Sequence, residues 1–173
     1  LTEGAFSVFG FDWSPDGSEI VFDHAPSQDP GDGGNADLSI VEVETGKLRP
    51  LVTQPGPDTN PRFSPDGTQV AFESAMARER FYYTNGYVAV VPRAGGAPVS
   101  LTPSFDEDAS LAGWGPSGIW FGAGQKTEAG LFRLDPATKA VARVALESTP
   151  VGFGFSFDRG FERVAYVGSS PTA

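Results

Sequence analysis

The stretch Trp13-Ser14-Pro15-Asp16-Gly17, followed by the apolar run Ile20-Val21-Phe22, decides the fold because the chain repeats it. Within this stretch, proline presets φ for the first corner of a β-turn, aspartate bonds the following backbone, and glycine accepts a positive φ. The pattern therefore predicts a hairpin that joins two antiparallel strands.

Three further copies of the pattern follow along the chain, spaced by roughly 40–50 residues, which is the length of a four-stranded propeller blade. The third copy has serine in place of aspartate, and the fourth keeps only the aromatic and a nearby glycine. The copies are Phe63-Ser64-Pro65-Asp66-Gly67 with Val70-Ala71-Phe72, Trp114-Gly115-Pro116-Ser117-Gly118 with Ile119-Trp120-Phe121, and Phe157-Asp158-Arg159-Gly160 with Val164-Ala165-Tyr166.

Each of the first three copies is followed by two apolar runs about a short turn, which indicates a second hairpin. These runs are Asp37–Glu44 and Leu48–Thr53, Tyr87–Pro92 and Val99–Thr102, and Leu131–Asp135 and Val141–Leu146. One helical turn is predicted over Ala75–Arg80, with Ser74 as its N-cap.

We therefore predict an all-β fold, a β-propeller fragment of about three and a half four-stranded antiparallel blades. The whole chain, 1–173, is expected to form one partial propeller. Its repeats are expected at about 6–53, 60–102, 110–146 and, incomplete, 153–173.

The two ends of the chain are expected to fall within blades. Leu1-Thr2 resembles the ends of the predicted fourth strands, at Leu51-Val52-Thr53 and Leu101-Thr102, and it is interpreted as the trace of an earlier blade. Because closed propellers have roughly 4–8 blades, the natural protein is expected to be longer on both sides.

Open blade ends predict self-association, because unpaired strand edges and apolar faces recruit other chains. The expected surfaces are the face around Phe9, Phe11 and Val21, and the edge strand Val164-Ala165-Tyr166-Val167.

Composition limits the class of partner. The formal net charge of −10 disfavours nucleic acid. The chain has no cysteine, so it has no disulfide framework and no thiolate metal site. The absence of a long apolar run predicts a soluble protein without a membrane partner, equally compatible with periplasm or cytoplasm.

The two Ser-Pro-Asp-Gly repeats resemble those of TolB-like propellers and of the propeller in the prolyl oligopeptidase family of serine peptidases, which includes dipeptidyl aminopeptidases and acylaminoacyl peptidases. The stretches 101–108 and 130–138 look more like the peptidase propellers than like TolB. This resemblance implies a propeller that restricts the access of large substrates to an α/β-hydrolase domain of the same parent chain, with peptides as substrates. The alternative is a TolB-like protein-interaction propeller with no enzymatic domain.

We expect no catalytic residue within the chain. The nearest approach to a Gly-x-Ser-x-Gly nucleophile elbow is Gly154–Asp158, around Ser156, which lacks the final glycine. His24 is the sole histidine, and it is expected to be structural or solvated.

No cofactor and no metal site are expected either. A cluster of oxygen donors occurs in a Gly-rich loop, at Asp29, Asp32, Asn35 and Asp37. Its spacing does not match a calcium loop, and turn residues explain it as a solvated connection. The acidic stretch Asp106–Asp108 is expected at one mouth of the channel.

The best candidate for contact with a substrate or partner is the loop that carries Arg78, Glu79, Arg80, Tyr82 and Tyr83. It combines charges with aromatic rings, which are enriched at recognition surfaces. In dipeptidyl-peptidase relatives a propeller insertion carries glutamates that hold the free amine of the substrate, whereas Glu79 here is a lone acid between two arginines. The alternative is an insertion that packs on the neighbouring blade or domain.

Overall fold

The structure is a computed structural model that describes residues 2–146 and 151–169, and its elements within those ranges are β-strands and two short 3-10 helices. Consecutive strands pair antiparallel into blades, which confirms the predicted partial β-propeller. The first blade consists of β1 (Ser7–Trp13), β2 (Glu19–Ala25), β3 (Asp37–Glu42) and β4 (Leu48–Val52). The second consists of β5 (Asp58–Phe63), β6 (Gln69–Ser74), β7 (Tyr87–Pro92) and β8 (Val99–Ser100).

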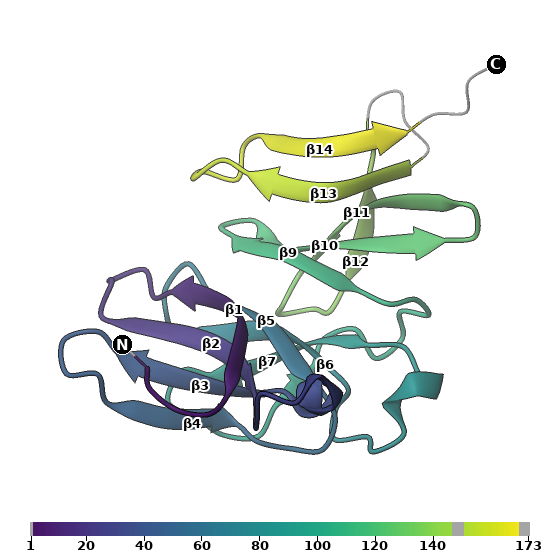
Figure 1. The fold of residues 1–173 in the computed structure, drawn as a ribbon. Helices are drawn as coiled ribbons and strands as arrows, with labels where there is room; N and C mark the ends of the chain where they lie inside the picture. The colour runs from purple at the N-terminus through teal and green to yellow at the C-terminus, as the bar shows by residue number, and fades with distance from the viewer. Residues whose placement is uncertain (1, 147–150, 170–173) are drawn as a thin grey trace.

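The third blade is followed by a hairpin that begins a fourth (Figure 1). A parallel pairing between Ala129 and Val151 joins this hairpin to the third blade in one six-stranded sheet. The third blade contains β9 (Ser110–Gly115), β10 (Gly118–Gln125), β11 (Glu128–Leu134) and β12 (Val141–Val144), and the hairpin contains β13 (Val151–Phe157) and β14 (Val164–Ser169).

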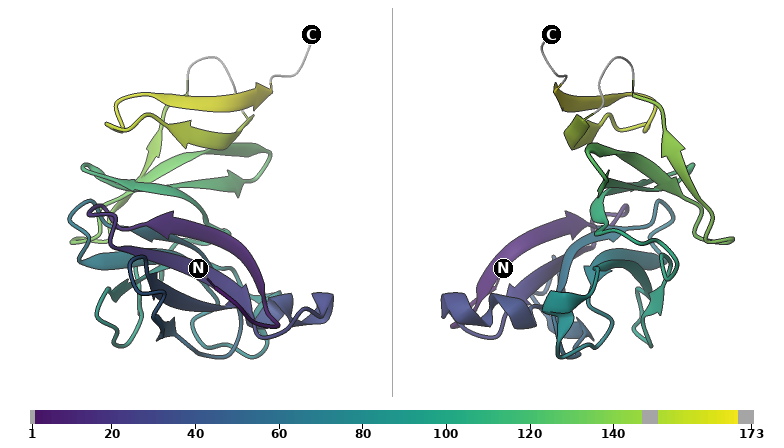
Figure 2. Two further views of the ribbon diagram at one scale, coloured as in Figure 1. Left: turned by 60° about the vertical axis from the view of Figure 1, so that its left-hand side comes forward. Right: turned by 90° about the vertical axis from the view of Figure 1, so that its right-hand side faces the viewer.

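The first strands of successive blades lie next to one another. β1 contacts β5, β5 contacts β9, and β9 contacts β13. Each of these strands is also an edge strand of its antiparallel blade, so β1, β5, β9 and β13 form the inner edge of a radial arrangement. The views in Figure 2 show the blades following one another around this edge.

The Ser-Pro-Asp-Gly turn between β1 and β2 is held by its own side chains. The Asp16 carboxylate accepts from the Ser14 hydroxyl at 2.6 Å and from the Ser18 backbone N–H at 3.0 Å. The Ser14 hydroxyl oxygen accepts from the Glu19 N–H at 2.9 Å. Gly17 has a φ of 70°, which a side chain would strain. The second copy repeats this network around Asp66, with Gly67 at 69°.

The third and fourth turns depart from this pattern. In the third, Gly115 pairs directly with Gly118, so the hairpin is shorter and closes through two residues. In the fourth, Asp158 accepts from two backbone N–H groups at 2.9 and 3.0 Å, and Phe161 takes the place of the turn glycine with a φ of 56°. Aspartate in the serine position thus preserves the fourth hairpin after Pro-Asp-Gly is lost.

The predicted helical turn over Ala75–Arg80 is wrong. Met76 and Ala77 adopt φ values of 53° and 60°, in the left-handed region that a right-handed helix excludes. A 3-10 helix, η2 (Phe81–Tyr83), forms further along the same connection, and η1 (Pro30–Asn35) occupies the matching connection between β2 and β3.

The apolar cores lie between blades, so each blade is stabilised by its neighbour. The first core joins blades 1 and 2 and includes Val21, Leu38, Ile40, Phe63, Val70 and Phe72. The second joins blades 2 and 3 and includes Ala71, Val88, Val90, Leu111, Ile119, Phe121 and Phe132.

Candidate functional site

The predicted contact loop lies between β6 and β7, and its side chains divide into packed and exposed groups. Tyr82 and Tyr83 are 77% and 89% exposed. Glu79 and Arg80 are also exposed. The Arg78 guanidinium lies 4.8 Å from the centre of the Tyr87 ring, a cation–π contact that ties the start of the loop to β7. All five predicted residues are therefore exposed, and Arg78 in addition has a structural contact.

This loop packs against the corresponding loop of the first blade. A Cβ atom on Gly34 of η1 would lie 3.1 Å from the Tyr82 hydroxyl and 3.2 Å from the Phe81 ring. The two connections are consequently neighbours at one end of blades 1 and 2 (Figure 2). Phe81 is half-buried beside this neighbouring loop, whereas Tyr83 is exposed.

A cavity of about 300 Å³ lies at the base of the loop, and Glu73 on β6 is among its lining residues together with Tyr82 and Asp108. The Glu73 carboxylate accepts from Asn60 Nδ2 at 2.8 Å and from the Leu111 N–H at 2.6 Å. Burial raises the pKa of Glu73, and the two hydrogen bonds oppose that shift. Glu73 thus links blade 2 to the first strand of blade 3.

Asp23 has the equivalent role between blades 1 and 2. Its Oδ1 accepts from the N–H groups of Phe9, at 3.2 Å, and Gly10, at 2.6 Å, and its Oδ2 accepts from the Asn60 N–H at 2.7 Å. The sequence analysis missed both inter-blade carboxylates. The available signal was an acid directly after the phenylalanine of the second strand in each of the first two repeats.

A larger cavity, of about 810 Å³, lies among the first strands of the four blades, at the end that carries the Ser-Pro-Asp-Gly turns. Asp12 and Arg62 contribute charge to its wall. Asp12 Oδ2 accepts from the Phe63 N–H at 2.8 Å. Burial raises the pKa of Asp12, opposed by this bond and by the charge of Arg62. The residues that line this cavity come from β1, β5, β9 and β13 and from the turns that follow these strands.

His24 lies between aromatic rings, with the Phe6 and Phe22 centroids each 5.4 Å from its own. Its Nε2 is 2.9 Å from Ser39 Oγ, and its Nδ1 is buried without a hydrogen-bond partner. A triad needs a carboxylate on that second nitrogen. Ser39 also lies within a regular strand and pairs with Phe22, unlike a serine at a strained elbow.

The structure also shows where the other candidate residues of the sequence analysis lie and which groups they contact. Ser156 is exposed on β13 and lines the 810 Å³ cavity. Asp29 caps η1 by accepting from the Gly31 N–H at 2.8 Å, and Asp108 accepts from the Gly86 N–H at 2.7 Å. Within residues 2–146 and 151–169, no three His, Cys, Asp or Glu side chains are placed together to hold a metal ion. None of the helices in these ranges is long and apolar enough to cross a membrane.

Comparison with curated proteins finds sequence similarity to a dipeptidyl-peptidase. The chain is 29% identical over 141 residues to dipeptidyl-peptidase 5 of Porphyromonas gingivalis, a match that covers 78% of this chain and 20% of that protein. The chain therefore spans about a fifth of the curated relative. No family model matches the chain.

Solved structures show the same fold at low identity. TolB from Acinetobacter baumannii aligns with a TM-score of 0.73 and 16% identity, over 96% of this chain and 39% of that one. A puromycin-hydrolyzing peptidase of Mycobacterium tuberculosis aligns with a TM-score of 0.66 and 16% identity, over 94% of this chain and 28% of that one. These matches confirm the predicted fold: the chain is a partial β-propeller, a fold that it shares with TolB and with this peptidase, and it is similar in sequence to a dipeptidyl-peptidase.

Proposed function

We propose that this chain is the non-catalytic propeller region of a prolyl oligopeptidase family serine peptidase, and that it restricts substrate access to a hydrolase domain of the same polypeptide. The observation that carries the proposal is the sequence similarity to dipeptidyl-peptidase 5 over most of this chain. The structural matches support the fold alone, because a propeller serves many functions.

The arrangement of the first strands supports a gating role. They line a cavity of about 810 Å³, which is within the volume range of ligand-binding clefts. Asp12, Arg62 and Arg159 would give a peptide in this cavity charged groups to contact. We propose that the exposed Tyr82 and Tyr83, with Glu79 and Arg80, contact the substrate or the hydrolase domain at the opposite end of the blades.

The test is to express the whole reading frame that contains this chain and to label it with a fluorophosphonate probe for serine hydrolases. Peptide mass spectrometry then locates the adduct. The proposal expects one labelled serine in a Gly-x-Ser-x-Gly motif outside residues 1–173, with labelling unchanged in Ser39→Ala and Ser156→Ala. An adduct on Ser39 or Ser156 would contradict it. A reading frame without a hydrolase domain would favour the TolB-like interaction module.

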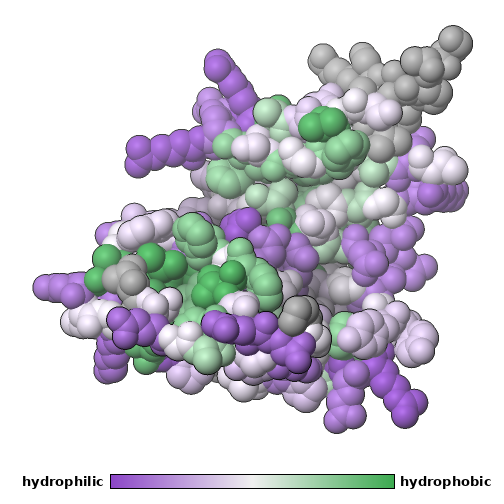
Figure 3. Space-filling model, viewed as in Figure 1, coloured by the Kyte–Doolittle hydropathy of each residue, from purple (hydrophilic) through white to green (hydrophobic). Residues whose placement is uncertain are grey.

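Self-association through the open faces is a second part of the proposal. Phe9, Phe11 and Trp13 on β1 are 62%, 60% and 51% exposed, and Phe153 and Val167 on the last hairpin are 51% and 55% exposed. The expectation that Val21 also lies on the open face is wrong, because it is buried in the core between blades 1 and 2. Figure 3 shows apolar surface over both regions. We expect the 173-residue chain alone to elute above its monomer mass in size-exclusion chromatography with light scattering. A stable monomer at micromolar concentration would contradict this.

A further inference from the structure

A groove between blades 1 and 2, beside the first Ser-Pro-Asp-Gly turn, is filled by Arg93. Its Nε donates to Glu19 Oε2 at 2.6 Å, and its Nη1 donates to Asp16 Oδ2 at 3.1 Å. Its guanidinium also lies 5.7 Å from the centre of the Phe63 ring. Arg93 belongs to blade 2 and Asp16 to blade 1, so the groove is a site where two blades hold a guanidinium between carboxylates and an aromatic ring.

The repeat creates the same groove between blades 2 and 3. Val70 and Ile119 occupy the same position of the repeat in blades 2 and 3. Val70 pairs with Val91, and Ile119 pairs with Leu134, so the residues two places after Val91 and Leu134 are also equivalent to each other. That residue is Arg93 in blade 2 and Pro136 in blade 3. The second groove has therefore lost the side chain that fills the first.

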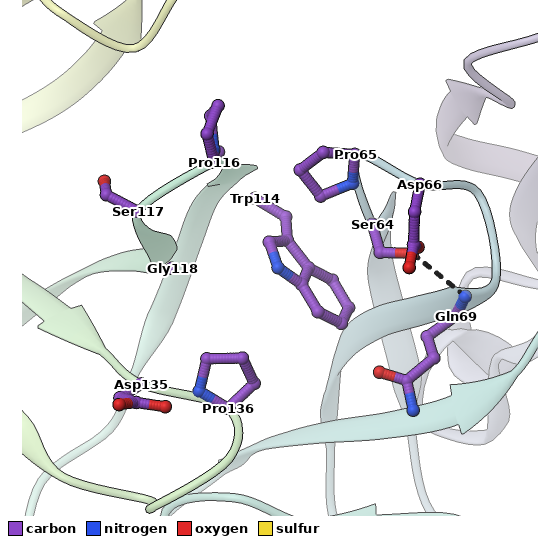
Figure 4. Close-up of a pocket in the computed structure, with 11 residues that line it drawn as sticks. Ser64, Pro65, Asp66, Gln69, Trp114, Pro116, Ser117, Gly118, Asp135 and Pro136 are labelled. Carbon is purple, nitrogen blue, oxygen red and sulfur yellow. Dashed lines mark hydrogen bonds between the residues drawn. The ribbon is translucent and has the colours of Figure 1, made fainter.

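The second groove is an open cavity of about 510 Å³ (Figure 4). Its wall contains Asp66 in the place of Asp16, Trp114 in the place of Phe63, and the uncharged Gln69 in the place of Glu19. Figure 4 shows the Trp114 indole between the Asp66 turn and Pro136. Asp135 adds a second carboxylate, and the described lining residues include no lysine or arginine.

The two carboxylates are ionised at neutral pH. The Ser64 hydroxyl and the N–H and hydroxyl of Thr68 lower the pKa of Asp66 to about 2. The Ala137 and Thr138 N–H groups lower the pKa of Asp135. All the Asp66 contacts within its turn are made by Oδ1, whereas the atom that binds arginine in the first groove is the Oδ2 of Asp16.

We propose that the groove between blades 2 and 3 binds an arginine side chain of a separate polypeptide, through Asp66 and Trp114 as the counterparts of Asp16 and Phe63, and through Asp135 in addition. The aromatic ring suits the flat face of a guanidinium, and the carboxylates suit its N–H groups. Pro65, Asp66 and Pro116 at the rim are exposed, so a docked chain can reach the groove. The net charge of −10 also favours a cationic partner. The proposal is independent of the peptidase assignment.

The test measures binding of N-acetyl-arginine amide to the protein expressed from its whole reading frame, by ligand-observed saturation-transfer NMR. N-acetyl-citrulline amide is the uncharged control ligand. Pro136→Arg restores the missing side chain, because the equivalent turn position in blade 2 is occupied by Arg93. Asp66→Asn removes one charge, and Asp16→Asn makes the same change in the groove that Arg93 already fills.

We expect roughly millimolar binding of the arginine amide to the wild type, several-fold weaker binding of the citrulline amide, loss of binding in Pro136→Arg and about fivefold weakening in Asp66→Asn. Binding in Asp16→Asn should stay at the wild-type level. If Pro136→Arg does not fold, the paired asparagine variants carry the test. No binding to the wild type, equal binding of both ligands, or equal effects of the two asparagine variants would overturn the proposal.

Discussion

Blades 1 and 2 are joined through buried carboxylates, whereas blades 3 and 4 are joined through aromatic rings packed on glycines. Asp23 accepts backbone N–H groups from both blades at the first interface. The equivalent residue of blade 3 is Gly122, where a Cβ atom would lie 3.1 Å from the Phe155 ring. The same position of the repeat thus joins neighbouring blades in two ways. At Asp23 it does so through hydrogen bonds to backbone N–H groups, and at Gly122 through the close approach of an aromatic ring to the backbone.

The largest expected effect is at Asp23. Asp23→Ala leaves three backbone N–H groups without their acceptor in a site where the carboxylate is 2% exposed. We expect the free energy of unfolding of the propeller region to fall by about 3 kcal/mol, measured by urea denaturation followed through tryptophan fluorescence. Asp23→Asn, which keeps an acceptor oxygen, should lose less. Equal losses in both variants would contradict the hydrogen-bonding role.

A pH-dependent effect of intermediate size is expected at Asp58, whose N–H donates to Ala36 O across the first interface at 2.8 Å. Burial raises the pKa of Asp58 from 3.8 to about 6, opposed by hydrogen bonds from Ser74 and Gln54. The folded state therefore holds a proton that the unfolded state releases. The stability from this group is full below about pH 4 and is lost as the pH rises through about 6.

Asp58→Asn should remove this loss. We expect the variant to be more stable than the wild type by about 2 kcal/mol at pH 7 and similar to it at pH 4, in denaturant titrations at both values. A difference between the two proteins that does not change with pH would show that the pKa of Asp58 is the same in the folded and unfolded states.

A smaller effect is expected at the interface of blades 3 and 4. A Cβ atom on Gly115 would lie 2.4 Å from Phe161 Cγ, so Gly115→Ala must displace this ring from its stack on Phe157. We expect a loss of about 1–2 kcal/mol, with faster hydrogen exchange in β13 and β14 and unchanged exchange in blades 1 and 2. Gly124→Ala is the control, because its nearest neighbour lies at 4.0 Å. Faster exchange in all blades would contradict a local role.

The smallest effect is expected at the exposed ion pair between Asp16 and Arg93. Asp16→Asn removes the charge, while the amide oxygen can still accept the turn hydrogen bonds. We expect only a small decrease in the free energy of unfolding, the smallest among these variants, because exposed ion pairs contribute little. Thermal denaturation at low and high salt provides the measurement. A loss of stability as large as that of Asp23→Ala would contradict the minor role that the exposure of this ion pair indicates.

The sequence was sufficient for the strands and the first two turns, because Ser-Pro-Asp-Gly satisfies its own hydrogen bonds locally. It was insufficient for Asp23, whose partner Asn60 lies in the next blade and is brought close only by the fold. Phe161 was also missed, because its positive φ depends on the fourth hairpin rather than on residue preference. For the candidate loop, exposure of Tyr82 and Tyr83 agrees with the prediction, and their role in binding stays a prediction.

Control of substrate access can be tested directly by measuring kcat/KM of the full-length protein on peptides of increasing length. The same series is measured on Asp23→Ala, which loosens the interface of blades 1 and 2. A gating propeller predicts that the wild type cleaves short peptides and discriminates steeply against long ones, and that Asp23→Ala raises the relative rate on long peptides. Equal kcat/KM on short and long peptides for the wild type would contradict the account.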